Sequence, residues 1–595
     1  MVILSPLKTL NFPMKTKISK MNMETNTRLM AQNNANIYAI KKNNISMKNF
    51  SNKNVLPRVT LKDNYVSDEI VTKVEEGVQR IKDIMARKLQ ECCHAEELVI
   101  IDAIQRLNLG YYFQDEIGDA LRKHYERFDT EEGGHDLHNT ALCFRLLRQG
   151  GYNVSADIFS KFTDEKGNFK QELEKDIKGL LSLYEASHLG VPGDHILDSA
   201  GSFSRHLLSN FDSIEPYEAS IIQNTLSLPC HKSLPIFMAA DFLQNFEISM
   251  KILHDCSRES RWMEEIRNLA RIDINKSQMS AQHEINEICR WWDELPLPKE
   301  QKDTRNQPVK WHMWSLACLQ GPHMAESRLE LTKVTSFIYT IDDIYDIFGT
   351  LDELTQFTEA VNRWECVDFD NMPDYMITSL KALFDTTNEI CHKIYMKHGF
   401  NPEKYIRKSW AEFCDECLLQ AKWIESGYIP TTEEYMKSAI GGTGLYVGHA
   451  LIFFLLGKGF TDKKCKDVLS SHPDICYLAA KILRLWDDLG SSEDEHQKYD
   501  GSVMECYMNE HKGSSPETAR EYVFAMISDA WSRLNENLLS TSPFSADFKA
   551  VVANFARLVP VMYTYDKNHR LRDLEKHMKP LVNTTSKQFK NVHGW

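Results

Sequence analysis

Three aspartates, Asp342, Asp343 and Asp346, lie at the end of an apolar stretch, LTKVTSFIYTIDDIYD, that covers residues 331–346. Apolar side chains recur every three or four residues in this stretch, which predicts a helix packed into a core. On a helix, Asp342 and Asp346 share a face and Asp343 lies beside them. Buried carboxylates without a partner are costly, so a hard cation that binds oxygen is the expected partner. A solvated helix end is the alternative.

A second acidic stretch, KILRLWDDLGSSEDE, covers residues 481–495. Asp487, Ser491 and Glu495 are spaced at i, i+4 and i+8, so a helix would place two carboxylates and a hydroxyl along one stripe. Arg484 lies three residues before Asp487, where a guanidinium would repel a cation unless an anion lies between them. A diphosphate fits this arrangement, because Mg²⁺ is commonly held by a few protein oxygens together with substrate phosphates.

The two motifs, DDIYD at 342–346 and DDLGSSEDE at 487–495, resemble the two metal motifs of plant class I terpene synthases. The likeness extends from about residue 60 to 580. It includes QRLNLGYYFQDEI from Gln105, DLHNTALCFRLLRQGGYNVSADIF from Asp136, DINKSQMSAQHEI from Asp273 and RWWDEL from Arg290. The resemblance implies that Mg²⁺, with Mn²⁺ as a possible substitute, binds as a multi-ion cluster with the diphosphate of the substrate.

The resemblance also assigns roles to individual residues. The metal ligands would be Asp342, Asp343, Asp346, Asp487, Ser491 and Glu495. The catalytic residues would be Asp342, Asp343, Asp346, Asp487 and Arg484. The residues that bind substrate would be Arg305, Asp342, Arg484, Asp487 and Trp314.

The segment RNQP at 305–308 departs from the family pattern, in which Arg-x-Arg usually holds the leaving diphosphate. Here Arg305 is followed by Gln307, a form similar to the family subgroup that makes acyclic products. Trp311 and Trp314 are three residues apart; such spacing is more often a core feature, but Trp314 matches an aromatic position of the family's active site. The tandem Arg pair that precedes a Trp in synthases of cyclic monoterpenes is absent, since the first Trp is Trp262.

Glycine breaks a helical pattern at Gly441, Gly442 and Gly444, which predicts a kink. A nucleotide-binding loop is the alternative, but the GxGxxG pattern is absent. In the family this region lines the substrate cavity. The resemblance places the last active-site helix and a closing loop at Tyr563, Tyr565 and Asp566.

Composition predicts an all-α chain, because 26 Gly and 19 Pro in 595 residues are few and no series of alternating strands is present. The net charge of −14 argues against a nucleic-acid partner.

Fourteen cysteines without a spaced framework indicate a reduced intracellular protein. The CxxC at Cys414 and Cys417 is better interpreted as two cysteines on one helix face than as a metal site. The longest apolar run, residues 444–457, is too short to span a bilayer and predicts a core helix.

The expected organisation has three parts. Residues 1–58 carry ten Lys or Arg against the single acid Glu24, which indicates a disordered transit peptide and, with the resemblance, the plastid as the location of a soluble enzyme. A plain disordered tail is the alternative. Residues 59–268 resemble the N-terminal helical, barrel-like domain of plant terpene synthases and lack the DxDD motif of a class II cyclase. Residues 269–595 resemble the C-terminal catalytic bundle.

The predicted function is a lyase that ionises geranyl diphosphate to an acyclic monoterpene, with linalool by water capture as first choice. If farnesyl diphosphate is accepted, the product would be nerolidol. An olefin synthase making myrcene or (E)-β-ocimene, a chain-elongating prenyltransferase and a non-catalytic helical scaffold are the alternatives. The enzyme is expected to act as a monomer.

Overall fold

The computed structural model describes residues 66–90, 94–128, 136–211, 216–256, 260–297, 305–365, 372–457, 460, 465, 473–491, 501–564 and 571–578. The segment 1–58, predicted to be a transit peptide, lies outside these ranges. Within them the regular structure is helical, and β pairing is limited to one isolated antiparallel bridge between Thr163 and Phe169. The prediction of an all-α fold is confirmed for the described residues.

The N-terminal part is a set of helices around an apolar core that includes Phe113, Phe144 and Phe159 and a smaller one that includes Tyr184 and Ile222. The Asp136 carboxylate caps the start of the helix at Leu137–Gln149 by accepting from the Asn139 amide at 2.8 Å. The α-helices of this part are α2 (Asp68–Gln90), α3 (His94–Arg106), α4 (Gln114–Phe128), α5 (Leu137–Gln149), α6 (Ile177–Ser187), α7 (His195–Ser209), α8 (Pro216–Ser227), α9 (Pro235–Gln244) and α10 (Phe246–His254). Short 3₁₀ turns are η1 (Gly110–Tyr112), η2 (Ala156–Phe162), η3 (Gln171–Lys175) and η4 (Cys230–Lys232).

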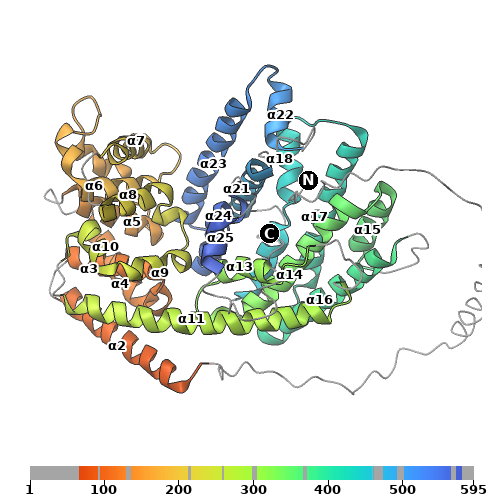
Figure 1. Cartoon of the computed structure of the whole chain (residues 1–595), viewed down its shortest axis with the longest axis horizontal. Helices are drawn as coiled ribbons and strands as arrows, with labels where there is room; N and C mark the ends of the chain where they lie inside the picture. The colour runs from red at the N-terminus through yellow and green to blue at the C-terminus, as the bar shows by residue number, and fades with distance from the viewer. Residues whose placement is uncertain are drawn as a thin grey trace, which may run out of the picture. The chain divides into compact units, whose positions relative to one another are not determined.

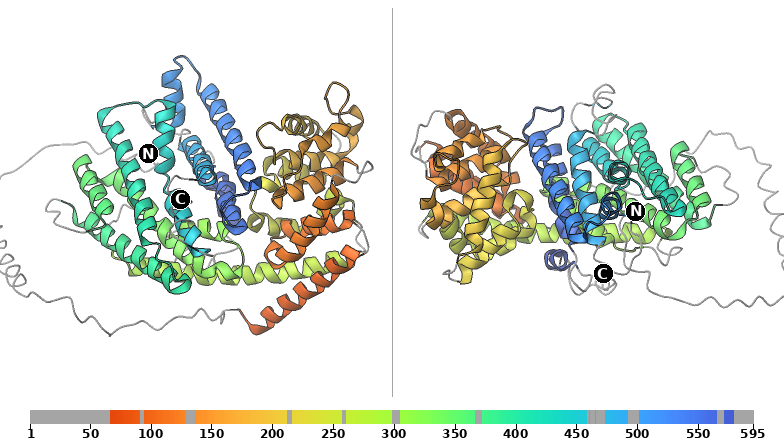
Figure 2. Two further views of the ribbon diagram at one scale, coloured as in Figure 1. Left: turned by 180° about the vertical axis from the view of Figure 1, so that it is seen from behind. Right: turned by 90° about the horizontal axis from the view of Figure 1, so that it is seen from above.

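The long helix α11 (Arg261–Glu294) connects this core to the next one, as Figure 1 shows. Its first turns bury Trp262 and Ile266 in the N-terminal core, and its last turns bury Ile288 and Trp292 in the second core. Helix α2 packs along its first half, as the left view of Figure 2 shows. The predicted boundary between residues 268 and 269 therefore falls within one continuous helix, and it stays a prediction.

The C-terminal part surrounds the largest apolar core of the described chain. Sequence signals set its helix starts: Pro308 occupies the first turn of α13, and Thr350 with Glu353 forms a capping box at α15. Its elements are α13 (Pro308–Cys318), η5 (Pro322–Met324), α14 (Ala325–Asp343), η6 (Ile344–Phe348), α15 (Leu351–Arg363), α16 (Asp374–His398), α17 (Glu403–Ser426), α18 (Thr432–Gly441), α19 (Leu445–Leu455), α21 (Asp474–Ser491), α22 (Val503–Glu510), α23 (Pro516–Leu539), α24 (Ala546–Tyr563) and α25 (Arg572–Met578).

The apolar helix α19 is buried along its length, as the sequence predicts. Among the described residues no single helix is long and apolar enough to cross a bilayer, although α18 and α19 pass that test together as a pair bent by 41°. Cys414 and Cys417 are buried and unpaired on α17, in agreement with their reading as helix-face cysteines.

Candidate active site

The first acidic motif lies where α14 changes into a π-helical turn. The predicted helix over 331–346 is present, with Asp342 and Asp343 as the last residues of α14 and Asp346 in η6. Asp342 is 1% exposed and Asp343 is 2% exposed. A π-helical turn widens the helix locally and is frequent at functional sites. The motif is thus buried, and the alternative of a solvated helix end is wrong.

Arg305 binds the first two aspartates from a segment 38 residues earlier in the chain than Asp343. Its Nε donates to Asp343 Oδ1 at 2.6 Å and its backbone N donates to Asp343 Oδ2 at 2.9 Å. Its Nη2 donates to an oxygen of Asp342 and to the carbonyl of Tyr339. The structure therefore brings together Arg305, Asp342 and Asp343, which the sequence predicts as parts of one site.

Two carboxylate oxygens of this motif have no hydrogen-bond partner. Asp342 Oδ1 and Asp346 Oδ2 are both buried and unsatisfied. Burial raises the pKa of Asp342 well above its usual value, with Asp346 adding to the rise and Arg305 opposing it. Burial also raises the pKa of Asp346 to about 6. Clustered, desolvated carboxylates with free oxygens are suited to a divalent cation, which would satisfy them without a proton.

Protein atoms alone do not complete a metal site in the described part of the chain. No group of three or more His, Cys, Asp or Glu side chains there has the geometry to enclose an ion. A hard cation such as Mg²⁺ commonly takes only part of its oxygens from the protein and the rest from phosphate and water. Asp342, Asp343 and Asp346 are the described residues that fit one wall of such a site.

The described part of the second motif, residues 487–491, lies on α21. Arg484 is 2% exposed and its Nη2 forms an ion pair with Asp487. Ser491 is the last residue of α21, and Glu495 lies outside the described residues. The positive charge of Arg484 contributes to lowering the pKa of Asp346, against the larger rise that burial causes.

Asp488 is a buried residue of this site that the sequence argument missed. It accepts from Arg484 Nε at 2.7 Å, from the Tyr435 hydroxyl at 3.0 Å and from the Val503 amide at 2.9 Å. These contacts tie α21 to α18 and α22 and hold the guanidinium of Arg484 in place. The only signal in the sequence was the tandem Asp487–Asp488 pair.

Aromatic rings from three helices meet at Trp314. Its indole Nε1 donates to the Tyr339 hydroxyl at 3.1 Å, and its ring stacks near Phe555 with centroids 6.2 Å apart. The Tyr563 ring lies 6.3 Å from it. Trp311 is fully buried between Trp292 and Tyr339, so it is a core residue. Tyr339 and Phe555 are not predictable from the sequence as site residues, because they belong to ordinary apolar stripes.

The predicted glycine break is present between α18 and α19. Gly444 has φ +68°, and a Cβ there would lie 2.6 Å from Ile338 Cγ2 on α14. Glycine is required for the conformation and for the close approach of α19 to the helix of the first motif. A nucleotide-binding loop is not formed, because helices precede and follow the break.

Comparison with known proteins finds similarity to terpene synthases along most of the chain. The family model "Terpene synthase, N-terminal domain" matches residues 43–226, and "Terpene synthase family, metal binding domain" matches residues 293–533. Probable terpene synthase 13 of Ricinus communis is 47% identical over 87% of this chain and 89% of its own length. An (E)-nerolidol synthase of Cannabis sativa is 43% identical over 82% of this chain and 88% of its own length. The chloroplastic S-(+)-linalool synthase of Arabidopsis thaliana is 41% identical over 85% of this chain and 87% of its own length.

A solved structure of similar fold contains metal ions and a diphosphate analogue. The crystal structure of isoprene synthase from grey poplar, in complex with three Mg²⁺ ions and dimethylallyl-S-thiolodiphosphate, superposes with a TM-score of 0.79 at 30% identity. The match covers 87% of this chain and 98% of that one. The chain is a carbon–oxygen lyase that uses a divalent metal and a prenyl diphosphate, and the scaffold alternative is wrong. By sequence and by fold, this protein belongs to the terpene synthase family.

Proposed function

We propose that the enzyme converts geranyl diphosphate with Mg²⁺ into linalool, and farnesyl diphosphate, where it is accepted, into nerolidol. The observation that carries the metal assignment is the pair of buried, unsatisfied oxygens on Asp342 and Asp346. The similarity to a linalool synthase and to a nerolidol synthase supports an acyclic tertiary alcohol as the product.

The ligands proposed for the metal come from both motifs. Asp342, Asp343 and Asp346 would hold it from α14 and η6, and Asp487, Ser491 and Glu495 from the second motif. Bound Mg²⁺ supplies positive charge that stabilises the departing diphosphate. Mn²⁺ is the expected substitute, because it too accepts carboxylate oxygens.

Arg305 and Arg484 are the guanidinium groups proposed to bind phosphate oxygens. In the described structure both are ion-paired with carboxylates of the two motifs. With these carboxylates engaged by a bound cation, the guanidinium groups of Arg305 and Arg484 would be free to bind phosphate oxygens. They would hold the leaving group while the C–O bond breaks and the diphosphate keeps the bonding electrons.

The rings at Trp314 are proposed to stabilise the allylic cation. Trp314, Tyr339 and Tyr563 present aromatic faces within one cluster, and faces of this kind attract positive charge. A water oxygen then bonds to the tertiary carbon and loses a proton, which gives the alcohol. Proton loss from the cation instead would give myrcene or (E)-β-ocimene, which is the second candidate outcome.

The acyclic outcome is attributed to weak retention of the diphosphate. Ring closure from geranyl diphosphate needs the anion to recombine at the tertiary carbon and then to leave again. Gln307 stands at the start of α13 where a second Arg is usual in the family, and the tandem Arg pair is absent. With less fixed positive charge, the cation is quenched before it cyclises.

The deciding experiment is incubation of the purified enzyme with geranyl, farnesyl and geranylgeranyl diphosphates in Mg²⁺ buffer. Products are separated by chiral gas chromatography. Linalool as the main product from geranyl diphosphate is expected. A profile dominated by limonene, pinene or another ring compound would overturn the acyclic proposal.

Three further features complete the proposal. Residues 1–58 are proposed to direct the enzyme to the plastid, a location that the names of chloroplastic relatives support. Comparing the N-terminus of the mature protein from plastids with Met1 tests this.

Residues 59–268 are proposed to support the catalytic residues 269–595. The enzyme is proposed to act as a monomer, and sedimentation of the purified protein tests its oligomeric state.

A further inference from the structure

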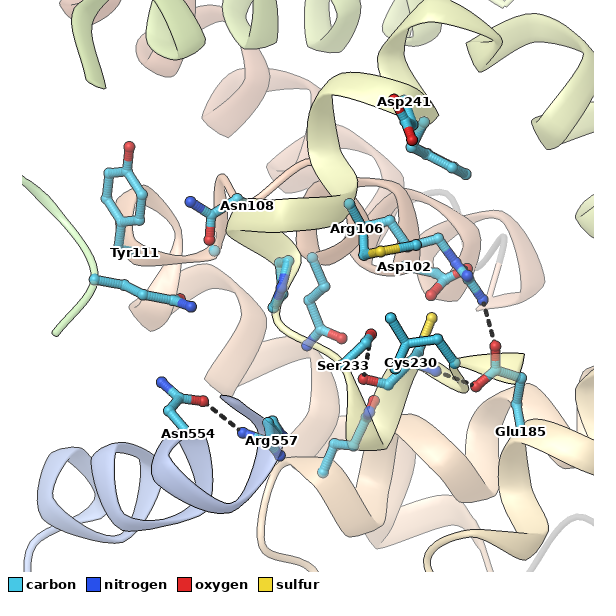
Figure 3. Close-up of a pocket in the computed structure, with 18 of the residues that line it drawn as sticks. Asp102, Arg106, Asn108, Tyr111, Glu185, Cys230, Ser233, Asp241, Asn554 and Arg557 are labelled. Atoms are coloured by element: carbon cyan, nitrogen blue, oxygen red, sulfur yellow. Dashed lines mark hydrogen bonds and ion pairs between the residues drawn. The ribbon is translucent and has the colours of Figure 1, made fainter. Parts of the chain in front are cut away.

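A cavity of about 750 Å³ lies between N-terminal helices and the C-terminal helix α24. Its wall combines α3, α8 and α9 with residues 318–324, α24 and one residue of α25. Figure 3 shows Arg557 and Asn554 on one side of this space and Arg106, Glu185 and Cys230 on the other. None of the residues assigned to the metal or the diphosphate lines it. The cavity is therefore separate from the candidate active site.

Arg557, which lines this cavity from α24, is held by neutral groups. Its Nε donates to the carbonyl of His231 at 2.7 Å, and one of its Nη atoms donates to Asn554 Oδ1 at 2.7 Å. No carboxylate among the described residues forms an ion pair with it. Burial lowers the pKa of Arg557 to about 10, and no neighbouring negative charge offsets this effect.

The buried arginines of the described chain have a carboxylate partner. Arg145 pairs with Asp102, Arg148 with Asp194 and Arg328 with Glu284. The active-site arginines are paired with aspartates as described above. Arg557 is half-buried. A partly desolvated charge without a counter-ion is costly, so the exception at Arg557 indicates a place for an anion that the chain does not supply.

The other charges around the cavity compensate one another. Arg106 donates to Asp102 at 2.8 Å and lies 3.7 Å from Glu185. Lys576 pairs with Asp241 at 2.5 Å. Arg557 is thus the cavity-lining cation of the described residues whose charge is left uncompensated. With one such guanidinium and several carboxylates nearby, the cavity suits a single negative charge better than a phosphate dianion.

Apolar side chains line much of the remaining wall: Ile221, Leu228, Met238, Phe242, Leu319 and Val551. We propose that this cavity is a binding site for a small amphipathic organic acid, whose carboxylate pairs with Arg557 and whose hydrocarbon part contacts these side chains. The volume is within the range of small-molecule sites, which are typically about 300–1,000 Å³ and combine apolar walls with a few polar groups.

A ligand in this cavity would contact both halves of the enzyme. Asn554 Nδ2 donates to the carbonyl of Cys318, the last residue of α13, at 3.2 Å. Arg557 in turn holds the carbonyl of His231 in η4, which belongs to the N-terminal part. Binding should therefore raise the melting temperature of the full chain, because a ligand that binds only the folded state stabilises it.

The test uses decanoate as the probe and the full-length enzyme at pH 8. Isothermal titration calorimetry is expected to show one site, with decanol binding at least tenfold more weakly because it lacks the charge. Arg557→Gln should weaken decanoate binding at least tenfold. Arg305→Gln, the matched control in the candidate active site, should leave it unchanged. If Arg305→Gln rather than Arg557→Gln abolishes binding, the probe occupies the active site and the proposal is overturned.

A second variant keeps the test decisive if Arg557→Gln does not fold. Gly110 lines the cavity, and a Cβ added there meets no atom within 4 Å. Gly110→Leu should fold normally and weaken decanoate binding several-fold by filling space. Unchanged affinity in this folded variant, no binding to the wild type, or equally tight binding of inorganic phosphate would each refute the proposal.

Discussion

Replacing Asp346 by Asn should stabilise the metal-free enzyme while it removes a proposed metal ligand. Burial raises the pKa of Asp346 to about 6 from an ordinary value of 3.8. At about 1.4 kcal/mol for each pKa unit, ionised Asp346 lowers the free energy of unfolding by about 3 kcal/mol at pH 8. The neutral amide of Asn avoids this cost, so a gain of about 3 kcal/mol is the upper expectation.

The pH dependence gives the sign of the effect. Below pH 3.8 the carboxyl is protonated in both folded and unfolded chains, so its charge costs nothing. Between pH 3.8 and about 6 the cost grows, because the unfolded chain ionises first, and above about 6 it is constant. The advantage of Asp346→Asn should therefore be largest at pH 7–8 and small at pH 4.5.

The assay is thermal unfolding in EDTA at both pH values, followed by circular dichroism. For a protein of this size, 3 kcal/mol corresponds to a rise of about 2–3 °C in Tm. Asp385→Asn is the matched control, since Asp385 is exposed on α16 and its replacement should change Tm by less than 1 °C. Adding Mg²⁺ with inorganic diphosphate should reverse the order, because only the wild type keeps the full ligand set. A lower Tm for Asp346→Asn at pH 8 without metal, or a gain at pH 4.5 as large as the gain at pH 8, would refute the reasoning.

Four other predictions concern turnover of geranyl diphosphate. Asp343→Ala should reduce kcat at least 10³-fold with little change in circular dichroism, and near-normal turnover at saturating Mg²⁺ would contradict its role. Arg484→Lys should lower kcat/KM by about 10- to 100-fold, because Lys cannot replace a guanidinium fork; unchanged kinetics would exclude phosphate contact. Glu495→Gln should raise the Mg²⁺ concentration needed for half-maximal rate several-fold, and an unchanged requirement would make Glu495 a surface acid. Gln307→Arg should increase the share of cyclic products in gas chromatography, and an identical product mixture would remove Gln307 from the argument.

The resemblance of the two acidic motifs to those of a known family led to the correct enzyme class. Local sequence patterns explain why the helices and the helix break could also be predicted. The apolar stripe of residues 331–346 predicts a buried helix that ends in carboxylates, and α14 with η6 has this form. The glycines at 441–444 predict a break, and the low Gly and Pro content predicts helices. These features depend on backbone propensity and on the periodicity of side chains within one helix, which short stretches of sequence contain in full.

Tertiary structure alone decided which distant groups meet. The pairing of Arg305 with Asp342 and Asp343, and the ties from Asp488 to Tyr435 and Val503, join separate elements that packing brings together. The same holds for Phe555 beside Trp314 and for the cavity around Arg557. In each case the residue type is common, and its role depends on which side chains surround it and on whether water reaches it. Those conditions are set by how helices pack across the whole chain, and no local pattern determines them.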